Sequence, residues 1–186
     1  MRRTLSLGLF ALALAGCEAP APVPAVPSPT IPLADPPNSN VICLLFLGRD
    51  CPISDGYSLE LAKLAKDYSL RGVAFVGLIP DADVTPAECE VHVKEFGLPF
   101  EVRPDRDRKT ARAAGATNVP QAVVYRDGAR VYSGRIDDRY SSVGGKRREH
   151  PTRHDLREAL DAILAGLPVT VPETTAVGCW IDLDSP

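Results

Sequence analysis

The sequence has 186 residues, of which 24% are charged and 45% hydrophobic, and its formal net charge at pH 7 is -3. The chain is long enough for one hydrophobic core of ordinary size and too short for several, so we expect one domain with terminal extensions. The charge gives no basic footprint, which argues against a nucleic-acid partner, and the hydrophobic content argues against general disorder.

Residues 1–17 have the pattern of an export signal. Arg2 and Arg3 precede an apolar run, and the run ends in Leu-Ala-Gly-Cys at 14–17. This ending resembles the lipidation box of bacterial lipoproteins, which implies that Cys17 is lipidated and becomes the first residue of the mature chain. The alternative is an ordinary secretory signal cleaved near Ala19. The run is too short for a conventional span, so we expect the mature chain not to cross the bilayer.

Residues 18–40 are predicted to be a proline-rich tether. Eight of the residues at 18–37 are prolines, which cannot build a helix or a central strand. In an extended polyproline conformation, such a segment holds the domain on the order of 50 Å from a lipid anchor.

The stretch from Val41 to Leu47 is an apolar run typical of a buried strand, and it leads to Cys51 and Pro52. Apolar residues then recur at helical spacing, at Tyr57, Leu61, Leu64, Ala65 and Tyr68. Cys51 is therefore predicted at a helix N-terminus, where proline fits the first turn. Free backbone N–H groups and the helix dipole favour a nucleophilic thiolate there. The alternative is that Cys51 is a small core residue.

The next elements alternate strand and helix. Residues 73–79 are predicted to form a second buried strand, and a capping box at Thr85 and Glu88 begins a helix that ends at Gly97. A short strand is expected at 99–102 and a short helix at 107–114.

The last part of the chain predicts a hairpin and a final helix. Val119 and Pro120 lead into a strand to residue 125, a turn follows at 126–128, and residues 129–135 return as an antiparallel strand. Thr152 is expected to cap a helix that ends at Gly166. Residues 167–186 are too apolar for plain disorder, so we expect a C-terminal tail that packs back on the domain.

This order of elements resembles the thioredoxin-like superfamily over residues 41–166. Segments 50–54, 134–140 and 177–181 are similar to those of exported redoxins of the AhpC/TSA or TlpA kind. The resemblance implies an α/β fold, with a central mixed sheet flanked by helices and a C-terminal extension. It implies no cofactor, with Cys51 as the attacking nucleophile and Pro120 as the cis-proline beside it. The expected substrate-binding residues are Pro52, Ser54, Val119 and Tyr140.

The sequence departs from this family at three positions. Ser54 replaces the second cysteine of thioredoxins, and Asp50 replaces the tryptophan that usually precedes the first. Gly48 stands where peroxiredoxins have threonine or serine, which argues against efficient peroxide reduction. The negative charge of Asp50 would also raise the pKa of Cys51 and partly oppose the helix dipole.

The other cysteines divide into two groups. Cys43 and Cys89 are expected to be buried and inert, because neither has an electropositive setting. Cys179 is expected to be the resolving partner of Cys51, since Gly178 permits close backbone approach and the apolar residues at 180–181 dock the tail. Four exported cysteines allow three full pairings, so the alternative is a tail cysteine that stays free or pairs with another protein.

We predict no metal site. His92 is expected to be an ordinary surface or hydrogen-bonded histidine. The spacing of His150 and His154 suits paired helix ligands, but Pro151 and the Thr152 cap place His150 outside the helix. The basic residues at 135–153 are expected to lie in a solvated loop, with a docking surface for an anionic partner as the alternative.

The sequence thus predicts a thiol–disulfide oxidoreductase of the cell envelope, facing the periplasm or the exterior through a lipid anchor at Cys17. Protein thiols or disulfides are its expected partners, and cell redox homeostasis its expected role. The alternatives are a thiol peroxidase, a copper-binding assembly protein resembling the Sco group, and a redox-dead binding module. In the copper protein, Cys51 would act with Cys179 or a histidine.

Overall fold

The computed structural model of the protein describes residues 31–184. The signal segment, Cys17 and most of the predicted tether therefore lie outside the described residues. A five-stranded sheet forms the centre, in the order β3-β2-β1-β5-β6. Its strands are β1 (Val41–Phe46), β2 (Val73–Ile79), β3 (Glu101–Pro104), β5 (Gln121–Arg126) and β6 (Ala129–Gly134). β1 is parallel to β2 and antiparallel to β5, so the sheet is mixed as expected.

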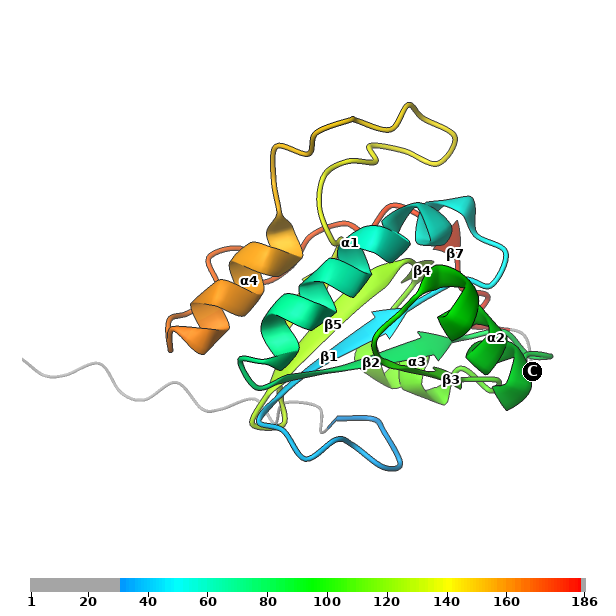
Figure 1. Ribbon diagram of the computed structural model, residues 1–186, viewed down its shortest axis with the longest axis horizontal. Coiled ribbons are helices and arrows are strands. Elements are labelled where there is room, and N and C mark those ends of the chain that lie inside the picture. Colours follow the sequence, from blue (N-terminus) through cyan, green and yellow to red (C-terminus); the bar gives the residue numbers. More distant parts are fainter. Residues whose placement is uncertain (1–30, 185–186) are drawn as a thin grey trace, which may run out of the picture.

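Four helices surround this sheet: α1 (Pro52–Ser69), α2 (Pro86–Phe96), α3 (Lys109–Ala114) and α4 (Asp155–Leu164). Figure 1 shows α1 lying across the sheet with α4 beside it. The hydroxyl of Tyr68 in α1 donates a hydrogen bond to the Arg157 carbonyl of α4 at 3.3 Å. Among residues 31–184, no helix combines the length and apolar character needed to cross a membrane.

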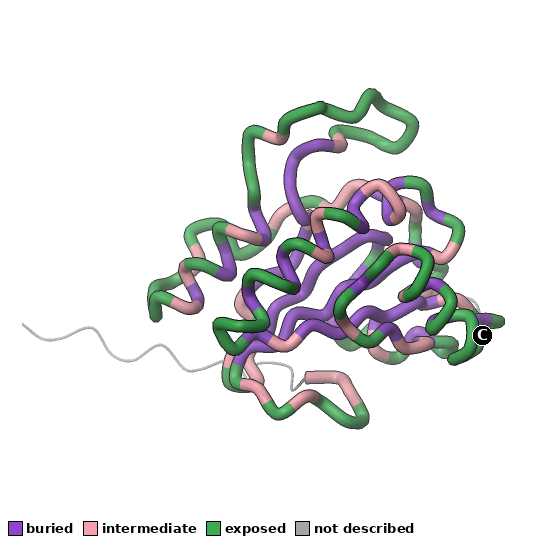
Figure 2. The backbone as a smooth tube through the Cα atoms, in the orientation of Figure 1, coloured by how far each residue is buried: buried purple, intermediate pink, exposed green. Residues whose placement is uncertain are grey.

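The middle of the sheet forms the core. All six residues of β1 are buried, as expected for a strand covered on both faces. Figure 2 shows the buried sheet, with the exposed residues gathered on the outer helix surfaces and loops. Cys43 in β1 is fully enclosed, which confirms its expected place in the core.

Two short elements begin two residues later than expected. The strand expected at 99–102 begins at Glu101, where pairing with Val76 of β2 starts. The helix expected from residue 107 begins at Lys109. The Asp105 carboxylate accepts hydrogen bonds from the N–H groups of Thr110 and Ala111, and this fixes the first turn there.

The prediction that Thr152 caps the last helix is wrong. α4 begins at Asp155, and His154 occupies the N-cap position without a side-chain cap. The backbone N–H and the hydroxyl of Thr152 both donate hydrogen bonds to the Asp138 carboxylate instead. Because Thr152 donates these hydrogen bonds to Asp138, it does not cap α4.

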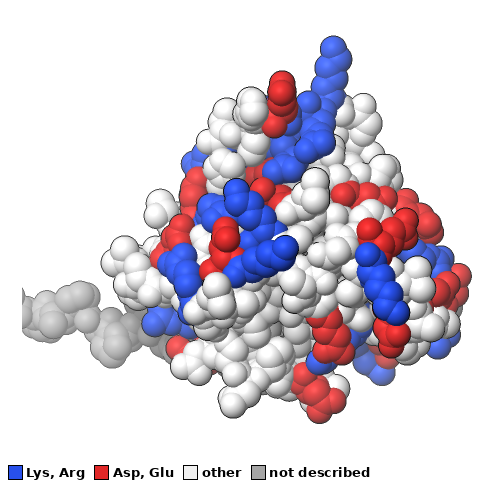
Figure 3. All heavy atoms as spheres, in the orientation of Figure 1, with Lys and Arg blue, Asp and Glu red and all other residues white. Residues whose placement is uncertain are grey.

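The basic segment at 135–153 is solvated only in part. Residues 141–150 are exposed, and Figure 3 shows lysine and arginine side chains toward the protruding part of the molecule. Arg135 and Arg139, however, belong to the fold. Arg135 pairs with Asp155 at 2.7 Å, and the buried Arg139 pairs with Asp137 at 2.7 Å. Charge alone does not distinguish these two residues from the exposed ones.

The C-terminal tail packs back on the domain as a second, two-stranded sheet. β7 (Cys179–Trp180) is antiparallel to β4 (Asn118–Val119), with Cys179 opposite Val119. The Ile181 side chain is buried, and its N–H donates a hydrogen bond to the Thr117 carbonyl at 2.9 Å. The expectation that Trp180 also docks the tail is wrong, because its side chain is 79% exposed. Successive residues of a strand face opposite sides, so Ile181 points inward and Trp180 outward.

We expect Gly178→Ala to displace β7 from β4. A Cβ atom at Gly178 would lie 2.0 Å from the Val119 carbonyl oxygen, and backbone cannot yield as a flexible side chain can. The substitution should lower the free energy of unfolding in urea by about 1–3 kcal/mol and slow formation of a Cys51–Cys179 crosslink. Val177→Ala, which adds no atoms, serves as the control. If Gly178→Ala forms the crosslink as fast as the wild type and is equally stable, the contact between Gly178 and Val119 does not position β7.

Candidate active site

Cys51 lies at the junction of β1 and α1. It is the N-cap residue of α1, with extended backbone angles, and Pro52 occupies the first turn as predicted. The residue is only 2% exposed, and in its thiol form its sulfur donates a hydrogen bond to the Val119 carbonyl at 3.4 Å. The strand, the helix N-terminus and the loop before β5 therefore converge on this thiol.

Cys179 lies directly against Cys51. The two Sγ atoms are 2.7 Å apart, although the residues are separated by 128 positions in the sequence. Both are free thiols, and the separation exceeds the roughly 2.05 Å of a disulfide bond by less than 1 Å. The pairing of β7 with β4 creates this contact, because it places Cys179 opposite Val119.

The surroundings of Cys51 favour its thiolate. Burial acts to raise the pKa of Cys51, but hydrogen bonds from the Cys179 thiol and from the N–H groups of Ser54, Cys179 and Ile53 outweigh it. The pKa of Cys51 is therefore lowered from its ordinary value. These donors hold the charged sulfur at the helix N-terminus, as the sequence predicts.

The pKa of Cys179 moves in the opposite direction. Burial raises the pKa of Cys179 to about 11, together with its hydrogen bond to Cys51 and the negative charge of that sulfur. Of the two thiols, Cys51 is therefore the one that loses its proton more readily, and Cys179 the one that keeps it.

The Val119–Pro120 peptide bond is cis, as expected from the family resemblance. Val119 is buried, and its carbonyl is the group that contacts the Cys51 thiol. Gly48 makes this approach possible, because a Cβ atom there would lie 2.6 Å from Cys51 Cβ and 2.8 Å from Val119 Cγ2. The sequence interpretation missed this packing role of Gly48.

The other expected substrate-binding residues are spread around the pair. Pro52 is exposed beside Cys51. Ser54 is buried, and its hydroxyl accepts a hydrogen bond from the Gly48 N–H at 3.0 Å, so it holds the loop before Cys51. Tyr140 packs on α1: its ring centroid lies 5.3 Å from that of Tyr57. Its described contacts are therefore with α1, whereas the family resemblance makes it a substrate-binding residue.

Asp50 has less influence on Cys51 than its position suggests. Its side chain is 86% exposed, and the carboxylate accepts a hydrogen bond from Arg49 at 3.3 Å. The carboxylate therefore lies between solvent and a positive charge, and the pKa of Cys51 remains lowered.

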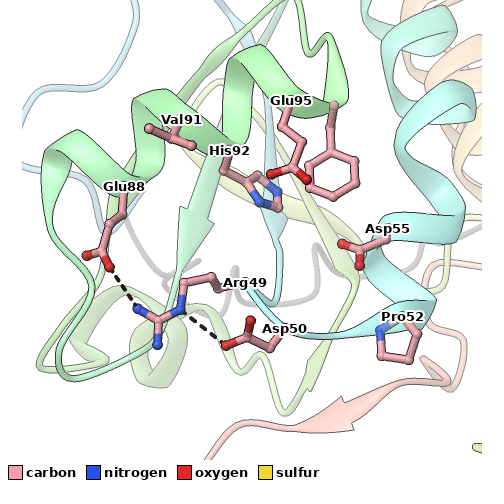
Figure 4. Close-up of a pocket in the computed structure, with 9 residues that line it drawn as sticks. Arg49, Asp50, Pro52, Asp55, Glu88, Val91, His92 and Glu95 are labelled. Atoms are coloured by element: carbon pink, nitrogen blue, oxygen red, sulfur yellow. Dashed lines mark hydrogen bonds and ion pairs between the residues drawn. The ribbon is translucent and has the colours of Figure 1, made fainter.

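One hollow borders the pair, and a second borders Asp50 and Pro52, the residues on either side of Cys51. The first, of about 400 Å³, is lined by both cysteines, Val119 and Trp180. A larger one, of about 550 Å³, lies between α1 and α2, with His92 and Asp55 facing it (Figure 4). His92 is buried against Phe96, and this burial lowers its pKa. No sequence pattern predicts this second hollow, because it depends on how the two helices pack.

The remaining candidates lie apart from the pair. Cys43 and Cys89 are fully buried, and burial raises the pKa of both thiols. His150 lies in the exposed loop. Within residues 31–184, no group of three or more histidine, cysteine or acidic side chains is placed to hold a metal ion.

Relatives of this chain are found among proteins of solved structure. No family model and no curated protein matches the sequence. A hypothetical protein from Sinorhizobium meliloti 1021 is 30% identical, with a TM-score of 0.67, over 80% of this chain and 82% of that one. The chain belongs to the same family as that protein. An uncharacterized conserved protein from Geobacillus kaustophilus is 28% identical, over 77% of each chain, with a TM-score of 0.67.

The wider relation is one of fold. The structure of MTB dsbF is 18% identical and covers 67% of this chain and 81% of its own, with a TM-score of 0.50. The mixed sheet, its flanking helices and the strand-to-helix junction give this chain a thioredoxin-like fold. The fold expected from the sequence is confirmed.

We expect the Cys51 thiol to titrate below the ordinary thiol pKa of about 8.5, because its hydrogen bonds stabilise the charged form. Ultraviolet absorbance of the thiolate, followed against pH in wild type and in Cys51→Ala, isolates this group. Cys179→Ala should raise the midpoint, since the thiol hydrogen bond is lost. An ordinary Cys51 midpoint, or one unchanged by Cys179→Ala, would contradict the proposed charge distribution.

Proposed function

We propose that the protein is a thiol–disulfide oxidoreductase whose exchanging groups are Cys51 and Cys179. The observation that carries this proposal is the 2.7 Å contact between two free thiols at a helix N-terminus of a thioredoxin-like fold. Two thiols so close need only a small approach to form a disulfide when a partner disulfide accepts their two electrons. The oxidised pair can then take two electrons from another pair of thiols. The partners are protein thiols or disulfides.

The chemistry divides between the two sulfurs according to their surroundings. Cys51 is the nucleophilic thiolate, because backbone N–H groups stabilise its charge. Cys179 is the exchange partner that replaces the missing second cysteine at Ser54. Val119 and Pro120 bound the pair on the side of the loop before β5, and Pro52 provides an exposed apolar surface beside it.

We also propose that the protein acts in the cell envelope, facing the periplasm or the exterior. The support is the export pattern at 1–17 and the Leu-Ala-Gly-Cys box that ends at Cys17. Residues 18–40 then form the tether, residues 41–166 the thioredoxin-like domain and residues 167–186 a tail packed on it.

The oxidoreductase is tested by the reduction of bis(2-hydroxyethyl) disulfide with dithiothreitol as the electron donor. Cys51→Ala and Cys179→Ala should each lower the rate to that measured without protein, because each removes one of the exchanging sulfurs. Cys43→Ala and Cys89→Ala are the matched controls and should keep most of the activity. If both site variants stay active and the controls lose activity, Cys51 and Cys179 are not the exchanging residues.

Parallel assays with hydrogen peroxide and with copper(I) address the two alternative functions. Faster reaction with peroxide than with the disulfide would favour a thiol peroxidase. Tight copper(I) binding without disulfide exchange would favour a copper-binding assembly protein.

Lipidation is tested on the protein isolated from its native membrane. Mass spectrometry should find acyl chains on Cys17 and a mature chain that begins there. A Cys17→Ser variant should leave the membrane fraction for the soluble one, because a lipid anchor contributes about 0.8 kcal/mol per buried methylene. A mature N-terminus at any other residue would exclude this site.

A further inference from the structure

We propose that the partner's sulfur is joined to Cys179, and that Cys51 breaks this bond. In the oxidised protein, an incoming thiolate would then attack the Cys179 sulfur and displace Cys51. This inference rests on the proposed function, because it requires a Cys51–Cys179 disulfide.

Access to the two sulfurs differs. Cys51 is 2% exposed and enclosed by the Val119 carbonyl and by Cys179 itself. Cys179 is half-buried and lies on β7, which pairs with β4 on one side. The next residue, Trp180, is 79% exposed and lines the same hollow as Cys179. Cys51 also borders this hollow, but Cys179 is the more exposed of the two, so a partner there has better access to Cys179 and contacts an aromatic surface beside it.

Reaching Cys51 directly would require β7 to leave its place. Several contacts oppose this movement. The Asn118 side chain donates a hydrogen bond to the Gly178 carbonyl at 3.3 Å, and Arg112 donates one to the Leu183 carbonyl at 2.6 Å. The buried Ile181 side chain holds the strand between these two points. Attack at Cys179 needs none of these contacts to break.

The relative ease with which the two sulfurs leave also favours attack at Cys179. In thiol–disulfide exchange, the sulfur whose thiol has the lower pKa departs more readily. The N–H groups of Ser54 and Ile53 stabilise a departing Cys51 thiolate, whereas the pKa of Cys179 is raised. The buried sulfur is thus the better leaving group, and the accessible sulfur the one to be attacked.

The reaction balances without an external reagent once the pair is oxidised. The partner thiolate forms a bond to the Cys179 sulfur, the Cys51–Cys179 bond breaks, and its electron pair leaves on Cys51. A second partner thiolate then attacks the partner's first sulfur and displaces Cys179, which takes up a proton. The partner gains a disulfide, and the protein becomes the dithiol. In reverse, Cys179 gives up its proton and attacks the partner's disulfide, which releases one partner thiolate. The Cys51 thiolate then attacks the Cys179 sulfur, forms the Cys51–Cys179 disulfide and releases the second partner thiolate.

This order exchanges the roles expected from the sequence, where Cys51 attacks the partner and Cys179 resolves. That expectation follows the family, in which the cysteine at the helix start meets the substrate. Here β7 covers that cysteine and brings a second sulfur to the surface.

Peptide mapping decides between the two orders. The full-length chain is oxidised with bis(2-hydroxyethyl) disulfide, mixed briefly with reduced glutathione, and stopped with excess N-ethylmaleimide. Trypsin cleaves after Arg49 and after Lys63, so Cys51 and Cys179 fall in separate peptides. We expect glutathione on Cys179 and maleimide on Cys51, with at least about tenfold more glutathione on Cys179 than on Cys51.

Glutathione mainly on Cys51, or equally on both cysteines, would overturn this order. Absence of the Cys51–Cys179 disulfide after oxidation would overturn the proposed function instead, so the two failures can be distinguished. The Cys43→Ala/Cys89→Ala double variant is the control for stray thiols and should give the wild-type distribution.

Discussion

The close packing of Gly178 on the Val119 carbonyl determines the geometry of the thiol pair. Because Gly178 has no side chain, β7 can lie against β4 and place Cys179 opposite Val119. On the other side of the loop, Gly48 lets Val119 reach Cys51. Val119 therefore packs against two glycines, Gly48 near Cys51 and Gly178 next to Cys179. The closeness of the sulfurs therefore depends on the absence of a side chain at both glycines.

The pair also shows how a fold can separate the two properties that thiol exchange needs. Charge stabilisation requires N–H donors, which are found at the helix start and therefore at Cys51. Contact with a partner requires a surface, which the C-terminal strand offers at Cys179 and Trp180. In a loop with two nearby cysteines, one turn of helix supplies both properties. Here they come from two residues that are in contact but lie 128 positions apart in the sequence.

The sequence predicted the parts of this site that depend on local patterns. The strand before Cys51, Pro52 in the first turn and the capping box at Thr85 were all correct, because each depends on residues close together in the chain. The errors concern distant partners. Thr152 binds Asp138 and does not cap its helix, and Trp180 faces solvent because pairing with β4 fixes which side of β7 points inward. No local pattern encodes either contact.

In the proposed exchange, the long sequence separation of the two cysteines links electron transfer to the stability of the whole domain. A bond between residues 128 positions apart closes a loop that contains the entire five-stranded sheet beyond β1 and all four helices. In the chain-entropy description, such a crosslink stabilises the folded state by about 5 kcal/mol relative to the unfolded chain. By linkage, the fold stabilises the disulfide by the same amount. Each reduction of the pair therefore removes a covalent constraint from the domain, and the reduced protein must hold its C-terminal strand by packing and hydrogen bonds alone.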